Sequence, residues 1–163
     1  MKNTLATLSA AFALCTIAAP VAMAQTNSHP SMASDHLMTT AEELKWVDIP
    51  SLPPGAKLAV IEGPLNQAGP VTFRVKFPAN YQLPAHWHPA IEHVTVMSGT
   101  FHMGMGDQLD RAKTKPLAAG AVAIMQPKTT HFAWTKEETI VQVHGMGPWG
   151  VTYVNPGDDP RKQ

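Results

Sequence analysis

Two histidines spaced two residues apart, His86 and His88, are the strongest chemical signal in this sequence. Alternate side chains of a β-strand share a face, so both imidazoles can point at one centre. Pro89 then interrupts the strand, and Glu92 can return from the start of the next strand as a third donor. His131 opens a later apolar run and could supply a fourth. This donor set suits a borderline divalent metal ion, although two histidines on one strand face can equally form an exposed polar edge.

Short strands separated by turns are the elements that must position these side chains. The sequence contains 11 glycines and 15 prolines, many of them in clusters between short apolar or alternating runs. Such spacing, without long helices between the runs, is typical of an antiparallel sandwich or barrel, so we expect an all-β domain. The expected strands cover residues 58–61, 71–77, 85–88, 92–97, 101–105, 121–125, 131–135, 139–144 and 151–154. A capping-box pattern at Thr39 and Thr40 predicts at most a short helical turn around residues 41–45.

The first 24 residues have the layout of a cleavable signal peptide. Lys2 is followed by an apolar run, and Ala22 and Ala24 are the small residues that a signal peptidase needs. We predict cleavage after Ala24 and a periplasmic or secreted protein, with an uncleaved membrane anchor as the alternative. The expected organisation is a signal peptide (1–24), a flexible linker (25–40), one β-barrel domain (41–157) and a polar tail that frays (158–163).

Composition narrows the function classes. Hydrophobic residues make up 44% of the 163 residues and charged residues 15%, which favours one compact domain over a disordered chain. The 12 Lys and Arg balance the 12 Asp and Glu, so neither nucleic acid nor anionic lipid is an expected partner. The single cysteine, Cys15, lies in the signal segment, so any metal site of the mature protein must use histidines and carboxylates.

The histidine pattern resembles the two sequence motifs of the cupin superfamily. His-x-His-xxx-Glu is followed, after six residues, by Gly99, and Gly120 precedes His131 by eleven residues. The resemblance covers roughly residues 46–154 and implies a single cupin domain, which is a double-stranded β-helix or jelly-roll barrel. It also implies a mononuclear metal centre with one or two open coordination positions, held by His86, His88, Glu92 and His131.

Four positions depart from the superfamily pattern. Asn80 stands where the first motif usually opens with glycine, and asparagine tolerates the same positive φ. In the second motif, Gln126 and Lys128 replace the usual Pro and Gly, and Thr135 replaces the final Asn. The turn that leads into His131 is therefore expected to differ in detail.

Residues beyond the metal ligands bear on the substrate. Arg74, Gln142 and His144 are candidates for lining the substrate pocket, with a solvated outer face as the alternative, because half of the positions on a barrel strand point inward. Cupins that act on oxalate commonly carry Arg or Asn three residues before the first metal histidine, where this chain has Leu83. The resemblance therefore favours a less polar substrate and does not imply an oxalate decarboxylase.

The resulting hypothesis is an exported metal-binding cupin that acts as a small-molecule enzyme, of oxygenase, isomerase or lyase type, on an unassigned substrate. The expected cofactor is one divalent transition metal ion per barrel, which could be Mn, Fe, Ni, Cu or Zn. A noncatalytic ligand-binding or sensor cupin and a structural barrel with a bound metal are the alternatives. The resemblance also implies a homodimer, for which unpaired strand edges give a physical motive.

Overall fold

The computed structural model describes residues 36–163. The predicted signal peptide, its cleavage site and most of the predicted linker lie outside the described residues. Residues 38–163 form one compact unit. No helix in the described part of the chain is long and apolar enough to cross a membrane.

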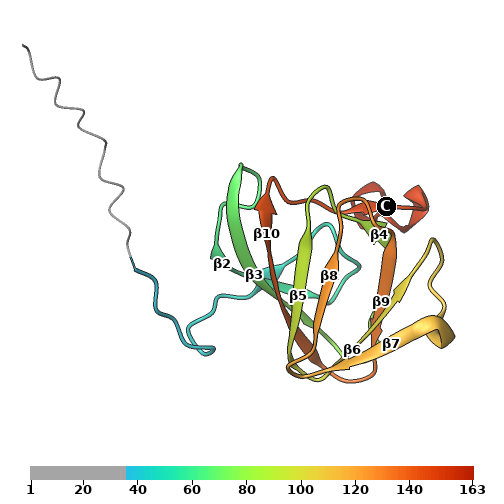
Figure 1. The fold of residues 1–163 in the computed structure, drawn as a ribbon, viewed down its shortest axis with the longest axis horizontal. Coiled ribbons are helices and arrows are strands. Elements are labelled where there is room, and N and C mark those ends of the chain that lie inside the picture. The colour runs from blue at the N-terminus through green and yellow to red at the C-terminus, as the bar shows by residue number, and fades with distance from the viewer. Residues whose placement is uncertain (1–35) are drawn as a thin grey trace, which may run out of the picture. The chain divides into compact units, whose positions relative to one another are not determined.

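Two antiparallel sheets face each other and confirm the all-β, jelly-roll prediction (Figure 1). The first sheet has the order β1 (Val47–Asp48), β2 (Lys57–Glu62), β3 (Gly69–Phe77), β10 (Thr139–Gly147), β5 (Glu92–Ser98) and β8 (Val122–Met125). The second has the order β11 (Thr152–Tyr153), β4 (Gln82–Trp87), β9 (His131–Thr135), β6 (Thr100–Met105) and β7 (Thr114–Ala118). Three short 3-10 turns complete the fold: η1 (Arg111–Lys113), η2 (Pro156–Asp158) and η3 (Pro160–Lys162).

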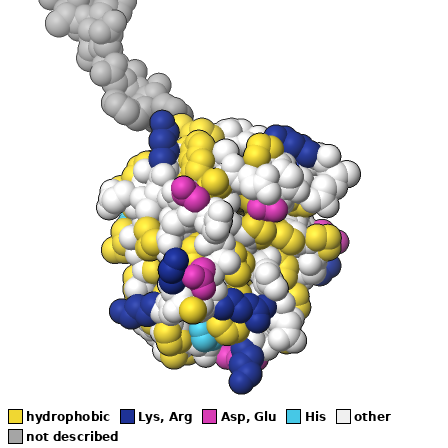
Figure 2. Space-filling model, turned by 90° about the vertical axis from the view of Figure 1, so that its right-hand side faces the viewer, with side chains coloured by type: hydrophobic (Ala, Val, Ile, Leu, Met, Phe, Trp, Pro, Cys, Tyr) yellow, Lys and Arg dark blue, Asp and Glu magenta, His cyan; other side chains and the backbone are white. Residues whose placement is uncertain are grey.

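The core lies between the sheets and follows from strand alternation. Along β3 every second side chain is buried, while Thr72, Arg74 and Lys76 point to the other face. The neighbouring strand β10 buries Val141 and Val143 by the same rule. The outer surface carries charges of both signs. Figure 2, which looks onto the right-hand side of Figure 1, shows Lys and Arg side chains interspersed with Asp and Glu.

Strand β7 is absent from the strands that the sequence predicts. This edge strand contains Thr114 and Lys115 and buries one side chain, Leu117. It also carries Pro116, which an edge strand tolerates because one row of its backbone groups has no partner strand. Residues 42–43 form a turn, within the expectation of at most a short helical turn there, and the Thr40 amide donates to Glu43 Oε2 at 2.8 Å as in a capping box.

The polar tail is ordered, which differs from the expectation that it frays. Asp159 is 6% exposed and accepts hydrogen bonds from Arg161, whose Nη2 also donates to the Val151 carbonyl at 3.0 Å. These contacts bind the last turns to the strand segment that precedes them.

Candidate metal centre

Three strands bring four ionisable side chains together inside the barrel. His86 lies near the end of β4, and His131 opens β9; the two are paired across the second sheet. His88 follows β4 by one residue, and Glu92 is the first residue of β5 in the first sheet. All four are buried, with exposures of 2%, 3%, 6% and 6%, respectively. The turn at Pro89 therefore carries the donors from one sheet to the other.

The donor atoms converge on one point. One ring nitrogen each from His86, His88 and His131 lies within 4.8 Å of the others, so these three buried histidines could hold a metal ion. The Glu92 carboxylate lies beside them: Oε1 is 3.5 Å from His88 Nε2, and Oε2 is 3.4 Å from His131 Nε2. The residues that the spacing predicted as a ligand set thus lie together.

Backbone carbonyls fix the orientation of each imidazole. The Nδ1–H groups of His86 and His131 donate to the Pro84 and Thr129 carbonyls at 2.8 and 2.9 Å, and His88 Nδ1–H donates to Gly150 O at 2.8 Å. A carbonyl oxygen only accepts, so the hydrogen of each neutral ring is on Nδ1 and the Nε2 lone pair is free. This is the arrangement by which proteins orient histidines toward a metal.

The protonation states agree with this arrangement. Burial lowers the pKa of His86 well below its ordinary value, and the neighbouring His131 and His88 lower it further. Burial also lowers the pKa of His88, although Glu92 opposes the effect. Burial alone would raise the pKa of Glu92, but the imidazoles of His131 and His88 hold it below the ordinary value. Neutral imidazoles beside a carboxylate are the forms that bind a metal cation.

Two of these atoms have unmet bonding capacity. His88 Nε2 and Glu92 Oε2 are fully buried and have no hydrogen-bond partner. Buried polar atoms almost always have one, and a metal cation bound between the imidazoles and the carboxylate would satisfy both. Three imidazole nitrogens and one carboxylate oxygen suit a divalent transition metal. The residues present therefore fit such an ion.

The four side chains lie in the wall of an apolar cavity of about 220 Å³. Its other walls come from both sheets and include Phe73, Phe101 and Met103. Ser51, Gly150 and Arg161 add the few further polar groups among the lining residues. A small molecule in this cavity would have one end against the histidines and Glu92 and the rest against hydrocarbon.

Arg74, Gln142 and His144 do not line this cavity. They lie on the outer face of the first sheet, where Arg74 Nε donates to Gln142 Oε1 at 2.9 Å and Gln142 Nε2 lies 2.9 Å from His144 Nε2. The alternation that buries Val141 and Val143 sends Gln142 and His144 outward. The expectation that these three residues line the substrate pocket is therefore wrong for this cavity.

The cavity instead has walls that sequence reasoning missed. Trp149 stacks on His88, and Arg161 reaches the cavity from the C-terminal turns. Ile49 and Leu52 come from the segment between β1 and β2. No periodic pattern marks these loop positions, so no local signal in the sequence identified them.

The departures from the cupin motifs are accommodated by the backbone. Asn80 adopts a φ of +59° and Lys128 a φ of +62°, the left-handed conformation that glycine usually supplies. The Lys128 amide donates to the His88 carbonyl at 2.8 Å, which attaches the turn before His131 to the end of β4. Thr135 donates from Oγ1 to the Pro78 carbonyl at 2.7 Å.

A two-sheet barrel with these inward-facing histidines defines a single-domain protein of the cupin superfamily. Within it, the chain belongs to the ChrR cupin-like domain family, which matches residues 34–149. No curated protein matches the sequence.

Solved structures confirm the fold. An RmlC-like cupin from Shewanella frigidimarina superposes with a TM-score of 0.54 at 19% identity, over 68% of this chain and 90% of that one. The polyketide cyclase RemF from Streptomyces resistomycificus has a TM-score of 0.63 at 16% identity, over 78% and 91%. A chain of the Rhodobacter sphaeroides complex of SigE with the anti-sigma ChrR has a TM-score of 0.50 at 17% identity, over 65% and 50%. At these identities the likeness concerns the fold alone.

Proposed function

We propose that this protein is a metal-dependent enzyme that acts on a small, mainly apolar molecule inside the barrel. One observation carries the proposal: three oriented histidines and the unpartnered oxygen of Glu92 meet in the wall of an apolar cavity. We propose His86, His88 and His131 as metal ligands, with Glu92 as the fourth. A purely structural metal site has every coordination position filled by protein ligands and needs no cavity beside it, whereas this site opens onto one.

The chain's own groups define what the site does. A divalent metal ion, when bound, supplies Lewis-acid polarisation of a substrate oxygen or activation of dioxygen. The apolar walls exclude water and hold the hydrocarbon part of the substrate. Glu92 is the one carboxylate among the residues that line the described cavity, and as a metal ligand it leaves the described lining without a further carboxylate for proton transfer.

A noncatalytic ligand-binding or sensor protein is the second candidate. The scarcity of acid and base groups in the cavity favours it, because ligand binding needs shape and apolar contact but no proton transfer. The fold shared with a chain of the SigE–ChrR complex supports it as well, since that complex contains an anti-sigma protein.

The proposal includes export and self-association. The sequence layout of residues 1–24 supports cleavage after Ala24 and a periplasmic or secreted location. A homodimer is supported by the edge strand β8, which pairs only with β5 and exposes Val122 and Ile124. For the metal, Mn, Fe, Ni, Cu and Zn are all compatible with three imidazole nitrogens and one carboxylate oxygen.

Metal content of the purified protein tests the proposal. We expect about one equivalent of a divalent transition metal by mass-spectrometric elemental analysis, and at least a tenfold loss in His86→Ala, because removing one ligand leaves an incomplete site. His102→Ala is the matched control, since His102 stacks on Trp134 outside the cavity. Absence of stoichiometric metal from the wild-type protein, also after incubation with each candidate ion, would contradict the proposal.

Catalysis and binding are separated by a screen of small apolar compounds that carry one or two oxygen atoms. Metal-dependent product formation that is lost in His86→Ala supports the enzyme. Saturable binding without turnover of any bound compound, with or without dioxygen, supports the sensor instead.

A further inference from the structure

The three histidines differ in where their orienting carbonyl comes from. His86 and His131 each donate from Nδ1 to a carbonyl two residues earlier in the chain. His88 donates to Gly150 O, which lies 62 residues later. The orientation of His86 and His131 is therefore set by backbone two residues away, whereas that of His88 depends on the C-terminal segment being in place.

Trp149, the residue before Gly150, makes a second contact with His88. The two rings stack with centroids 4.7 Å apart and planes 23° apart. Phe73 packs edge-on against Trp149, with ring centroids 5.4 Å apart, and the Trp149 amide donates to the Leu65 carbonyl at 2.6 Å. A Cβ at Gly145 would lie 2.7 Å from the indole ring, so the space for Trp149 is closely filled.

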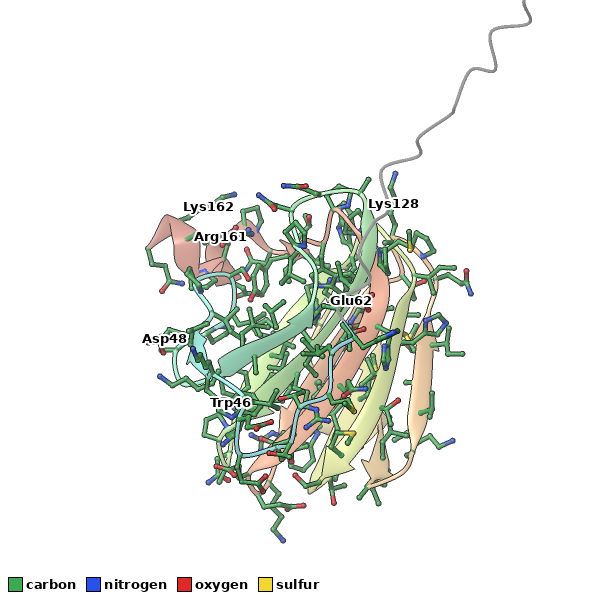
Figure 3. All side chains as sticks on the ribbon, turned by 90° about the vertical axis from the view of Figure 1, so that its left-hand side faces the viewer. Trp46, Asp48, Glu62, Lys128, Arg161 and Lys162 are labelled. Carbon is green, nitrogen blue, oxygen red and sulfur yellow. The ribbon has the colours of Figure 1, made fainter. Side chains whose placement is uncertain are left out.

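The segment that carries Trp149 and Gly150 is itself attached to the barrel. Strand β11 pairs with β4, Tyr153 opposite His86, and the Val154 amide donates to the Ala85 carbonyl at 2.9 Å. Arg161, in the C-terminal turns at one end of the molecule (Figure 3), donates to the Val151 carbonyl and is paired with Asp159. The backbone on both sides of the His88 contact is thus fixed.

We propose that Trp149 and Gly150 are positioning residues for His88. The Gly150 carbonyl selects the ring nitrogen that faces the donor cluster, and the indole fixes the plane of the imidazole. This inference rests on the proposed metal site and adds that one of its ligands is controlled by the C-terminal segment. Loosening that segment frees His88 while His86 and His131 keep their orientation.

Cobalt-substituted protein tests this inference, because Co²⁺ reports ligand geometry in its visible spectrum. We expect Trp149→Leu to alter the cobalt bands and to release the ion to a chelator roughly tenfold faster than the wild type, the effect typical of losing an orienting contact. Trp134→Leu is the matched control, because it removes another Trp–His stack, onto His102, at 3.9 Å and away from the cavity. We expect Trp134→Leu to leave the spectrum unchanged and the release rate within twofold. Trp149→Phe, which keeps an aromatic face, should restore most of the wild-type behaviour.

Metal-free protein supplies an independent measurement by NMR. In the wild type we expect the Nδ1–H protons of all three histidines to be protected from exchange, and in Trp149→Leu only that of His88 to lose protection. Wild-type spectra and release rates in Trp149→Leu, with His88 still protected, would overturn the inference. Failure of the wild-type protein to bind cobalt or any other divalent ion would contradict the proposed function, while the NMR comparison would still decide the role of Trp149.

Discussion

The buried histidines make the metal-free protein sensitive to acid. The pKa of His86 and that of His88 lie below the ordinary value in the folded state, mainly because burial disfavours the charged ring. In the unfolded chain both histidines take up a proton near pH 6.5. The unfolded state therefore binds more protons below that pH, and folding stability falls as the pH decreases.

We expect the free energy of unfolding of the chelator-treated protein to be flat above pH 7. Below about pH 6.5 it should fall by up to ~1.4 kcal/mol per pH unit for each of the two histidines. Glu92 adds to the loss at lower pH, because its pKa is also depressed in the folded state. Urea titrations at several pH values measure this slope. His86→Gln should reduce it and His102→Gln should not; a flat profile from pH 7 to 5 would contradict the prediction.

For single residues, the sequence predicts which side chains lie together wherever strand geometry alone determines their positions. Alternation and the turn at Pro89 sufficed to group His86, His88 and Glu92, and the superfamily motif added His131. The same rule says that Gln142 and His144 share a face but not which face. Packing of the sheets decides that: the apolar Val141 and Val143 take the interior, so Gln142 and His144 lie outside.

The turn between β5 and β6 depends on glycine. Gly99 adopts a φ of +73°, and a Cβ there would lie 2.5 Å from Glu138 O and 2.6 Å from Thr139 Oγ1. We expect Gly99→Ala to destabilise the protein by roughly 2–4 kcal/mol, from backbone strain and overpacking together. Gly120→Ala is the control, because Gly120 has a φ of +86° with no atom near the added Cβ. In urea denaturation Gly120→Ala should lower the free energy of unfolding by about 1–2 kcal/mol, from backbone strain alone. Equal losses of stability in the Gly99 and Gly120 variants would exclude a steric contribution at Gly99.

Strands with a regular run of apolar residues between turn-forming residues could be predicted from the sequence. Strand β7 and the C-terminal turns, which lack such a pattern, could not. The prediction for residues 131–135 coincides with β9, because apolar residues there lie between two turn clusters. Strand β7 was missed because Lys115 and Pro116 obscure its alternation. The C-terminal turns were expected to fray because their composition is polar, but their stability comes from specific hydrogen bonds of Asp159 and Arg161 that composition does not report.

The cavity is a property of the whole molecule. Its lining combines both sheets, the segment between β1 and β2, and the C-terminal turns. The apolar lining residues are those that ordinary core packing would also require, and nothing in a single element indicates that the assembled barrel leaves about 220 Å³ unfilled. The sequence therefore predicted the metal donors and a less polar substrate, but not the walls around them.

Native mass spectrometry of protein recovered from the producing cells tests the two whole-molecule proposals. We expect a chain with the mass of residues 25–163, which export and cleavage after Ala24 would produce.

We also expect dimers, because Val122 and Ile124 on the edge strand β8 are 57% and 54% exposed and form an apolar surface that a second copy would cover. Val122→Lys combined with Ile124→Lys should yield monomers, since burying lysines against a second copy is costly. Val60→Lys, on β2 away from this edge, should leave the dimer intact. A chain of full-length mass would contradict export, and a wild-type protein that stays monomeric at micromolar concentration would contradict the dimer.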